Sequence, residues 1–138
     1  MNNSNTFIAK LRDSGLRPTK QRIKICQLLF KSEKTFHFTI NDLAVLIKKN
    51  LNQKISLATI YNTVHAFKKK GYLKEISINS EKTYFDTNTS NHHHFIDVST
   101  NEIVDLKDDE VGKIKIKKNL RGKKVKSIEV LVKLESSN

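Results

Sequence analysis

Apolar residues recur at helical spacing in four segments of the first half of the chain. Phe7 and Leu11 mark the first segment, and a loop over residues 50–54 separates the third segment from the fourth. Residue types that favour helix ends flank the segments: Gly15, Thr19, Thr39, Ser56 and Gly71. The pattern therefore predicts four helices. The predicted inward stripe of the fourth helix is Leu57, Ile60, Val64 and Phe67.

After Gly71 the apolar period changes from helical spacing to two. Leu73, Ile76 and Ile78 predict one short strand, residues 83–86 predict another, and Asn79-Ser80 would form the turn between them. Several helices followed by a basic β-hairpin are typical of a winged helix-turn-helix. In that fold the last helix enters the major groove of DNA and the hairpin lies beside the phosphate backbone.

The remainder of the chain predicts a second, smaller unit. Residues 92–98 and 102–106 are expected to form a hairpin, the stretch from 108 to 120 a helix, and the stretch from 125 to 134 a long terminal strand. A unit of about fifty residues buries little core by itself, so pairing with a second copy is its expected role. The expected fold is α+β, with a winged-helix domain over 1–86 and a small α/β dimerisation and effector-sensing domain over 87–138.

Charge divides the chain in the same place. The net charge is +12, and residues 1–86 contribute 16 basic against 6 acidic residues, whereas residues 87–138 contribute 10 against 8. A basic excess favours a polyanionic partner, which could be DNA, RNA or an anionic membrane surface. A uniformly lysine-rich composition is the alternative, but it does not account for the asymmetry.

Cysteine usage and hydropathy limit the kinds of site and the cellular location that we expect. Cys26 is the single cysteine, so an internal disulfide and a Cys-x-x-Cys zinc site are excluded. It lies in an apolar run, where a buried small side chain is the favoured interpretation. The chain has no apolar stretch of signal-peptide or transmembrane length, so we expect a cytoplasmic protein without a membrane partner.

The outward face of the fourth predicted helix offers side chains suited to DNA. An asparagine can bond bidentately to adenine, and tyrosine and threonine can touch thymine methyl groups and phosphates. The candidates on this face are Ala58, Thr59, Tyr61, Asn62 and His65. The candidate phosphate contacts are Arg17, Lys20, Arg22, Lys68 and Lys82. A solvated polar face is the alternative for any single lysine, but the combined pattern favours contact with double-stranded DNA.

Three of the five histidines are consecutive, at positions 92, 93 and 94. On a strand His92 and His94 share one side while His93 faces the other, so the three cannot simply chelate one ion. They could serve two sites or flank a planar ligand such as haem. Imidazole with nearby carboxylates and no thiolate suits Zn, Fe, Mn or Ni. A solvent-exposed polar strand end is the alternative.

Five segments together resemble the ferric uptake regulator (Fur) superfamily: GLRPTKQR at 15–22, HFTINDL at 37–43, SLATIYNTVHAF at 56–67, KTYFDTNTSNHHHF at 82–95 and EIVDL at 102–106. The chain looks most similar to the iron response regulator branch of alphaproteobacteria, which has related blocks and no Cys-x-x-Cys. The resemblance implies a homodimer that binds inverted-repeat operators. It also implies control by iron status, through haem or a divalent metal such as Fe, Mn or Zn.

The resemblance further implies which residues hold the effector. Positions of the family's interdomain metal site are matched by His37, Asp86, His93 and Asp105, and Phe95 stands where many members have a further histidine. His92 and His94 match a second site, or would bind haem. The later histidine of that second site has no counterpart here. The structural zinc of many members is not expected, because its cysteines are missing.

Two other classes of function compete with a regulator. One is a metal- or haem-binding buffering protein whose basic surface is incidental. The other is an enzyme, which we do not expect, because the sequence shows no nucleophile elbow, phosphate loop or carboxylate pair.

Overall fold

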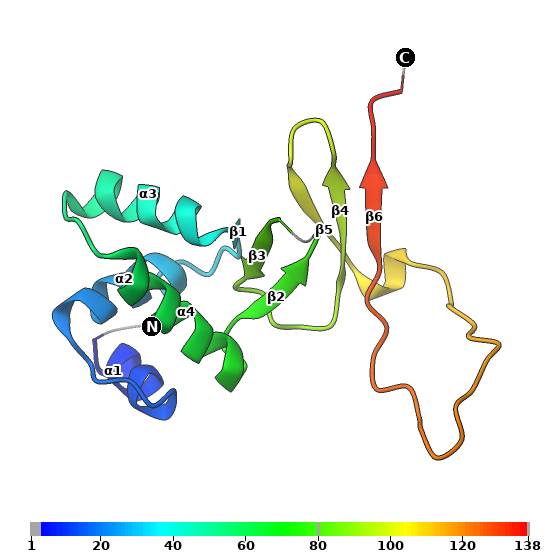
Figure 1. Cartoon of the computed structure of the whole chain (residues 1–138), viewed down its shortest axis with the longest axis horizontal. Coiled ribbons are helices and arrows are strands. Elements are labelled where there is room, and N and C mark those ends of the chain that lie inside the picture. The colour runs from blue at the N-terminus through cyan, green and yellow to red at the C-terminus, as the bar shows by residue number, and fades with distance from the viewer. Residues whose placement is uncertain (1–3, 80, 138) are drawn as a thin grey trace. The chain divides into compact units, whose positions relative to one another are not determined.

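The computed structural model describes residues 4–79 and 81–137 of the chain. They separate into a first unit that ends at Thr89 and a second unit that begins at Ser90 (Figure 1). The first unit is mainly helical and the second is built around a small sheet, so the predicted α+β class is confirmed. No helix in the described part of the chain is long and apolar enough to cross a membrane.

The first unit contains the four predicted helices: α1 (Ser4–Asp13), α2 (Lys20–Phe30), α3 (Ile40–Leu51) and α4 (Leu57–Lys70). The side chain of Thr19 accepts a hydrogen bond from a backbone N–H of the first turn of α2, and Ser56 does the same for α4. Thr39 forms a capping box with Asp42 at the start of α3. Gly71 ends α4 with a φ of 90°, in the left-handed region that favours glycine.

Three details of these helices differ from the sequence prediction. Helix α3 continues to Leu51, and Asn52 ends it with a φ of 44°, so the loop predicted from residue 50 begins later. Leu57, predicted to face inward, is 54% exposed, since it opens the first turn of α4 and Ile55 just before it takes the buried position. Thr63, which was not predicted to face inward, is buried, and its hydroxyl donates to the carbonyl of Thr59, so this hydroxyl is satisfied.

The wing is a three-stranded antiparallel sheet of β1 (His37–Phe38), β2 (Lys74–Ser77) and β3 (Thr83–Asp86), in the order β1-β3-β2. The β2–β3 hairpin was predicted, and β1 was not. The predicted turn falls partly on Ser80, which lies outside the described residues. On its near side, the Asn79 side chain accepts the backbone N–H groups of Glu81 and Lys82.

The second unit is a three-stranded sheet of β4 (His93–Asp97), β5 (Ile103–Leu106) and β6 (Leu131–Leu134), in the order β5-β4-β6. Strands β4 and β5 form the predicted antiparallel hairpin, with Asn101 at a φ of 63° in its turn. Strand β6 pairs with β4 in parallel, which requires the long connection that runs between them.

That connection corrects two predictions. In place of a helix over 108–120 there is one 3-10 turn, η1 (Asp108–Glu110), followed by chain without regular secondary structure. Gly112 disfavours a helix there, and residues 113–117 alternate lysine with isoleucine at the period of a strand. The predicted long strand from 125 is also shorter, because pairing with β4 begins only opposite His94, at Leu131.

Candidate DNA-binding surface and metal centre

The outward face of α4 presents the side chains that the sequence pattern selected. Ala58, Tyr61 and Asn62 are exposed, and Thr59 and His65 are half-buried. The Tyr61 ring lies on His65, with ring centroids 4.2 Å apart, and His65 in turn contacts the Phe85 ring of β3 edge-on at 6.1 Å. The wing therefore restrains Tyr61 in advance, which reduces the entropy that it loses on contact with a ligand.

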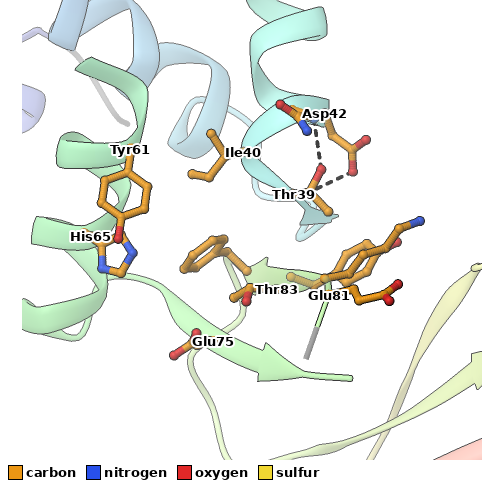
Figure 2. A pocket seen from close by; sticks show the side chains of 12 residues that line it. Thr39, Ile40, Asp42, Tyr61, His65, Glu75, Glu81 and Thr83 are labelled. Carbon is orange, nitrogen blue, oxygen red and sulfur yellow. Dashed lines mark hydrogen bonds between the residues drawn. The ribbon is translucent and has the colours of Figure 1, made fainter. Parts of the chain in front are cut away.

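A groove of about 590 Å³ separates this face of α4 from the hairpin. Figure 2 shows Tyr61 and His65 on one side and Glu75 and Thr83 on the other. Lys82, a predicted phosphate contact, also lines it, together with the acids Asp42, Glu75 and Glu81. The mixed charge makes the groove itself a poor phosphate channel.

The cations at the end of α4 are partly engaged within the first unit. Lys68, predicted to meet phosphate, forms an ion pair with Glu75 of β2. Lys70 lies 3.7 Å from a carboxylate oxygen of Asp13 in α1. Both lysines also lie in the last turn of α4, where the helix dipole favours positive charge. They therefore help to hold α4 in place, whatever else they contact.

The remaining predicted cations meet at the start of α2. A cleft of about 540 Å³ is lined by Arg17, Thr19, Lys20, Gln21, Arg22 and Thr59. The structure thus brings three cations from one segment next to the first turn of α4. The Arg22 guanidinium donates to the backbone carbonyl of Arg17 at 3.0 Å, which fixes the Arg22 side chain near the cleft. Cations beside hydroxyl and amide donors suit a phosphate group.

The consecutive histidines divide between the two faces of β4 as the strand period predicts. The His92 and His94 rings lie 4.5 Å apart on one side, and both are buried. Each Nε2 atom lies 3.3 Å from the same oxygen, Oδ1 of Asp105 on β5. Three potential metal ligands therefore converge at one point within the second unit.

The hydrogen bond on the far side of His92 determines which ring nitrogen carries the proton. Its Nδ1 lies 2.7 Å from the carbonyl oxygen of Ser90, which can only accept, so Nδ1–H is the donor. In the neutral ring Nε2 then holds a lone pair directed at the Asp105 carboxylate, and two acceptors face each other. A cation between them removes the repulsion. A histidine oriented in this way by a backbone carbonyl is typical of metal ligands.

His93 has a different set of partners. Its Nδ1 accepts the backbone N–H of Val130 at 2.9 Å, so its Nε2–H donates to Asp108 at 2.9 Å. The sequence interpretation grouped His93 with Asp105, whereas the structure places Asp105 with the other two histidines. Asp108 was not selected from the sequence, since an acid at the start of a short turn gives no distinguishing signal.

A second imidazole–carboxylate pair lies within the first unit. His37 of β1 and Asp86 of β3 are partners in the strand register, and His37 Nε2 lies 3.2 Å from Asp86 Oδ2. Asp86 is fully buried, and its other oxygen accepts the backbone N–H of Asn88. A buried carboxylate is costly unless it is paired, so this position suits a cation or a charged imidazole.

Cys26 takes no part in either donor set. It is fully buried in the apolar core of the first unit. Burial raises the pKa of its thiol to about 12, so the thiolate needed for metal binding does not form near neutral pH. The interpretation of Cys26 as a small apolar core residue is confirmed.

Four helices and a wing with a polar face on the last helix define a winged-helix DNA-binding unit, here joined to a small sheet rich in histidine. The model of the ferric uptake regulator family matches residues 13–134. The chain belongs to the ferric uptake regulator family. The prediction that it is a transcriptional regulator and not an enzyme is therefore confirmed.

Individual relatives agree with this assignment. The chain is 36% identical over 107 residues to the peroxide-responsive repressor PerR of Staphylococcus aureus strain Mu50, covering 78% of this chain and 70% of that protein. Its fold is similar to the ferric uptake regulator of Pseudomonas aeruginosa with manganese, at 21% identity and a TM-score of 0.69, over 96% of this chain and 98% of that one. The regulator of Francisella tularensis with iron gives 17% identity and a TM-score of 0.68, over 88% and 92%.

Proposed function

We propose that this regulator is a cytoplasmic homodimer that reads an inverted-repeat operator with α4 and responds to a divalent metal ion. The observation that carries the DNA part is that Tyr61 and Asn62 are both exposed on α4 and that Tyr61 is restrained through His65 against the wing. Asn62 offers the amide that bonds bidentately to adenine. The cleft around Arg17, Lys20 and Arg22 supplies phosphate contacts that set orientation without selecting sequence.

Dimerisation through the second unit is supported by the apolar side chains that its sheet region leaves exposed. Val98, Val104 and Leu134 of its sheet region are 52%, 48% and 42% exposed. Apolar side chains on a sheet this small are best covered by another copy of the same surface. Two copies would present two α4 helices to two half-sites, which is what an inverted repeat requires.

The metal part rests on the point where His92, His94 and Asp105 converge, with His37–Asp86 as a further donor pair of the first unit. Imidazole and carboxylate ligands without thiolate suit Fe, Mn or Zn. Two structures of similar fold, the ferric uptake regulators of Pseudomonas aeruginosa with manganese and of Francisella tularensis with iron, agree with this chemistry. When bound, the ion would supply charge neutralisation and cross-linking between β4 and β5.

Haem fits the same residues less well. The axial ligands of a haem iron approach from opposite faces of a wide planar ring. His92 and His94 are buried neighbours on one side of a strand, and both point at a single carboxylate oxygen. This arrangement favours a small ion over haem. The response to metal therefore need not be specific to iron.

The DNA part is tested by replacing one base-reading side chain. Duplexes enriched from a random pool by rounds of binding define the preferred operator. Asn62→Ala should weaken binding to it by about 1–3 kcal/mol, roughly five- to 150-fold, and leave binding to unrelated DNA almost unchanged. Asn50→Ala, an exposed asparagine at the end of α3, is the matched control. An unchanged sequence preference in Asn62→Ala would contradict the proposal.

The metal part is tested on the dialysed protein with Mn, Fe, Zn and haemin in parallel. His94→Ala should lose metal binding and the metal-dependent change in operator affinity, whereas Asp109→Asn, a neighbouring exposed acid, should keep both. A Soret shift lost in His94→Ala without any divalent metal binding would establish haem in its place. Metal binding that leaves operator affinity unchanged would favour a buffering protein.

A further inference from the structure

The chain between η1 and β6 concentrates positive charge. Residues 113–126, here called the basic arm, contain no acid and eight cations: Lys113, Lys115, Lys117, Lys118, Arg121, Lys123, Lys124 and Lys126. The rest of the second unit contains eight acidic and only two basic residues. The small net charge of the second half of the sequence is therefore the sum of two opposite parts. The basic arm has a net charge of +8, and the rest of the second unit has a net charge of −6.

The basic arm contains neither helix nor paired strand, and it is exposed along its whole length. Figure 1 shows it as a long loop, yellow to orange, that leaves η1 and returns to β6. Every residue from 112 to 127 is exposed. Its one backbone hydrogen bond among the described residues, from Lys123 N–H to the Leu120 carbonyl, closes a turn in which Gly122 has a φ of 73°. No cation of the arm forms an ion pair with a carboxylate of residues 4–79 or 81–137.

The base of the arm is oriented by its apolar residues. Ile114, Val125 and Ile128 line a cleft of about 310 Å³ in the second unit, next to His93 and Asp108. Lys113 is the one cation of the arm in this lining. The other seven cations lie outside the cleft and are exposed, so the arm presents a cationic surface to solvent.

We infer that the basic arm is a second DNA-binding element, separate from the winged helix, which contacts backbone phosphates without reading bases. Duplex DNA carries one negative charge per ~1.7 Å of its axis, and cations that neutralise phosphates gain affinity by releasing condensed counterions. Eight like charges in fourteen residues repel one another, and a polyanion relieves that repulsion. The arm's side chains are almost all lysine or aliphatic, and lysine binds phosphate as a point charge.

This inference shares its ligand with the proposed function but stands on different residues. The winged-helix proposal predicts a sequence preference that depends on Asn62. The arm predicts a contribution to binding that is the same for every sequence and depends on salt. One can fail while the other holds, because operator preference and salt slope are separate measurements.

The test is the salt dependence of binding by the full chain to a mixed-sequence duplex about three helical turns long, so that two half-sites would fit. The variant carries Lys115→Gln, Lys117→Gln, Lys118→Gln and Lys124→Gln. Two controls accompany it: the same four lysines replaced by arginine, which keeps the charge, and Lys31→Gln, Lys34→Gln, Lys48→Gln and Lys49→Gln, exposed lysines of the first unit. Circular dichroism verifies folding, and sedimentation verifies oligomeric state.

Removing four phosphate contacts should lower the slope of log Kd against log salt by about 3 to 4, and weaken binding at low salt more than tenfold. The arginine variant should keep the wild-type slope, and the first-unit control should lose much less. A glutamine variant with the wild-type slope would overturn the inference. So would a glutamine variant that becomes monomeric, because the arm would then bind the acidic body of a second copy.

Discussion

The two units bury different kinds of side chain. In the first unit fifteen residues form one apolar cluster drawn from all four helices and the wing. In the described part of the second unit the buried apolar residues are Ile96 and Leu106, and the other buried side chains are three histidines. An apolar core is stable by itself, whereas buried imidazoles need partners such as carboxylates, a metal or a second chain. The core of the first unit therefore needs no further partner, whereas the buried histidines of the second unit do.

The largest expected effect is on the apolar core of the first unit. Phe67→Ala should lower the free energy of unfolding of that unit by about 3–5 kcal/mol, because it leaves a cavity among side chains that cannot fill it. Leu57→Ala, on the same helix but half exposed, should cost well under half as much. Urea denaturation followed by circular dichroism measures both. Equal losses in the two variants would mean that α4 packs differently from the structure.

The next effect concerns the histidines of the second unit. Manganese at a hundred times its Kd should raise the stability of that unit by about 2.7 kcal/mol, since it binds the folded state only. Hydrogen exchange at the β4 amides measures the change, and the amides of α2 serve as the internal reference. His94→Ala should abolish the gain. Equal slowing of hydrogen exchange by metal in both units would contradict the prediction that metal stabilises only the second unit.

A smaller effect should separate the units by concentration. If the second unit is completed by another copy, each tenfold dilution lowers its stability by about 1.4 kcal/mol per dimer, and that of the first unit stays the same. Hydrogen exchange at two protein concentrations reads both units in one sample. Concentration-independent exchange in β4 would show that the second unit is stable as a monomer.

The smallest effect concerns the reactivity of the Cys26 thiol, and the related change in stability appears only above pH 9.0. With its pKa raised to about 12 by burial, Cys26 should not react with a thiol reagent at pH 8 until the first unit unfolds, and should then react fully. A raised thiol pKa also means that the folded state holds its proton more tightly. Stability from this group is therefore present below pH 9.0 and is lost as the pH rises towards 12. Rapid labelling of native protein would contradict the buried position.

Local chemistry made much of the first unit predictable. Thr19, Thr39 and Ser56 cap the helices at which the sequence placed them, and Gly71 ends the last one, because these signals act within a few residues. Strand β1 escaped prediction, since two residues carry no period and pair with β3 only through the fold. The exposed position of Leu57 likewise depends on tertiary packing.

The second unit was less predictable for the same reason. The alternation of lysine and isoleucine in residues 113–117 has the period of a strand, and this alternation and Gly112 both count against the helix that was predicted over 108–120. The division of the histidines between two faces followed from strand geometry alone. Their partners did not, because Asp105 and Asp108 are both acids after β4, and only the strand register and η1 decide which histidine each one meets.

The parallel pairing of β6 with β4 also fixes an order of events as the chain folds. The β4–β5 hairpin joins Ile96 to Ile103, seven residues apart, whereas the Val130–His93 bond closes a loop of 37 residues. The longer closure costs about 1.5 kcal/mol more chain entropy, so the hairpin forms first and β6 docks onto it later. Until then one edge of β4 is open to intermolecular pairing. Lysines just before the late strand would act as gatekeepers that keep such intermediates apart.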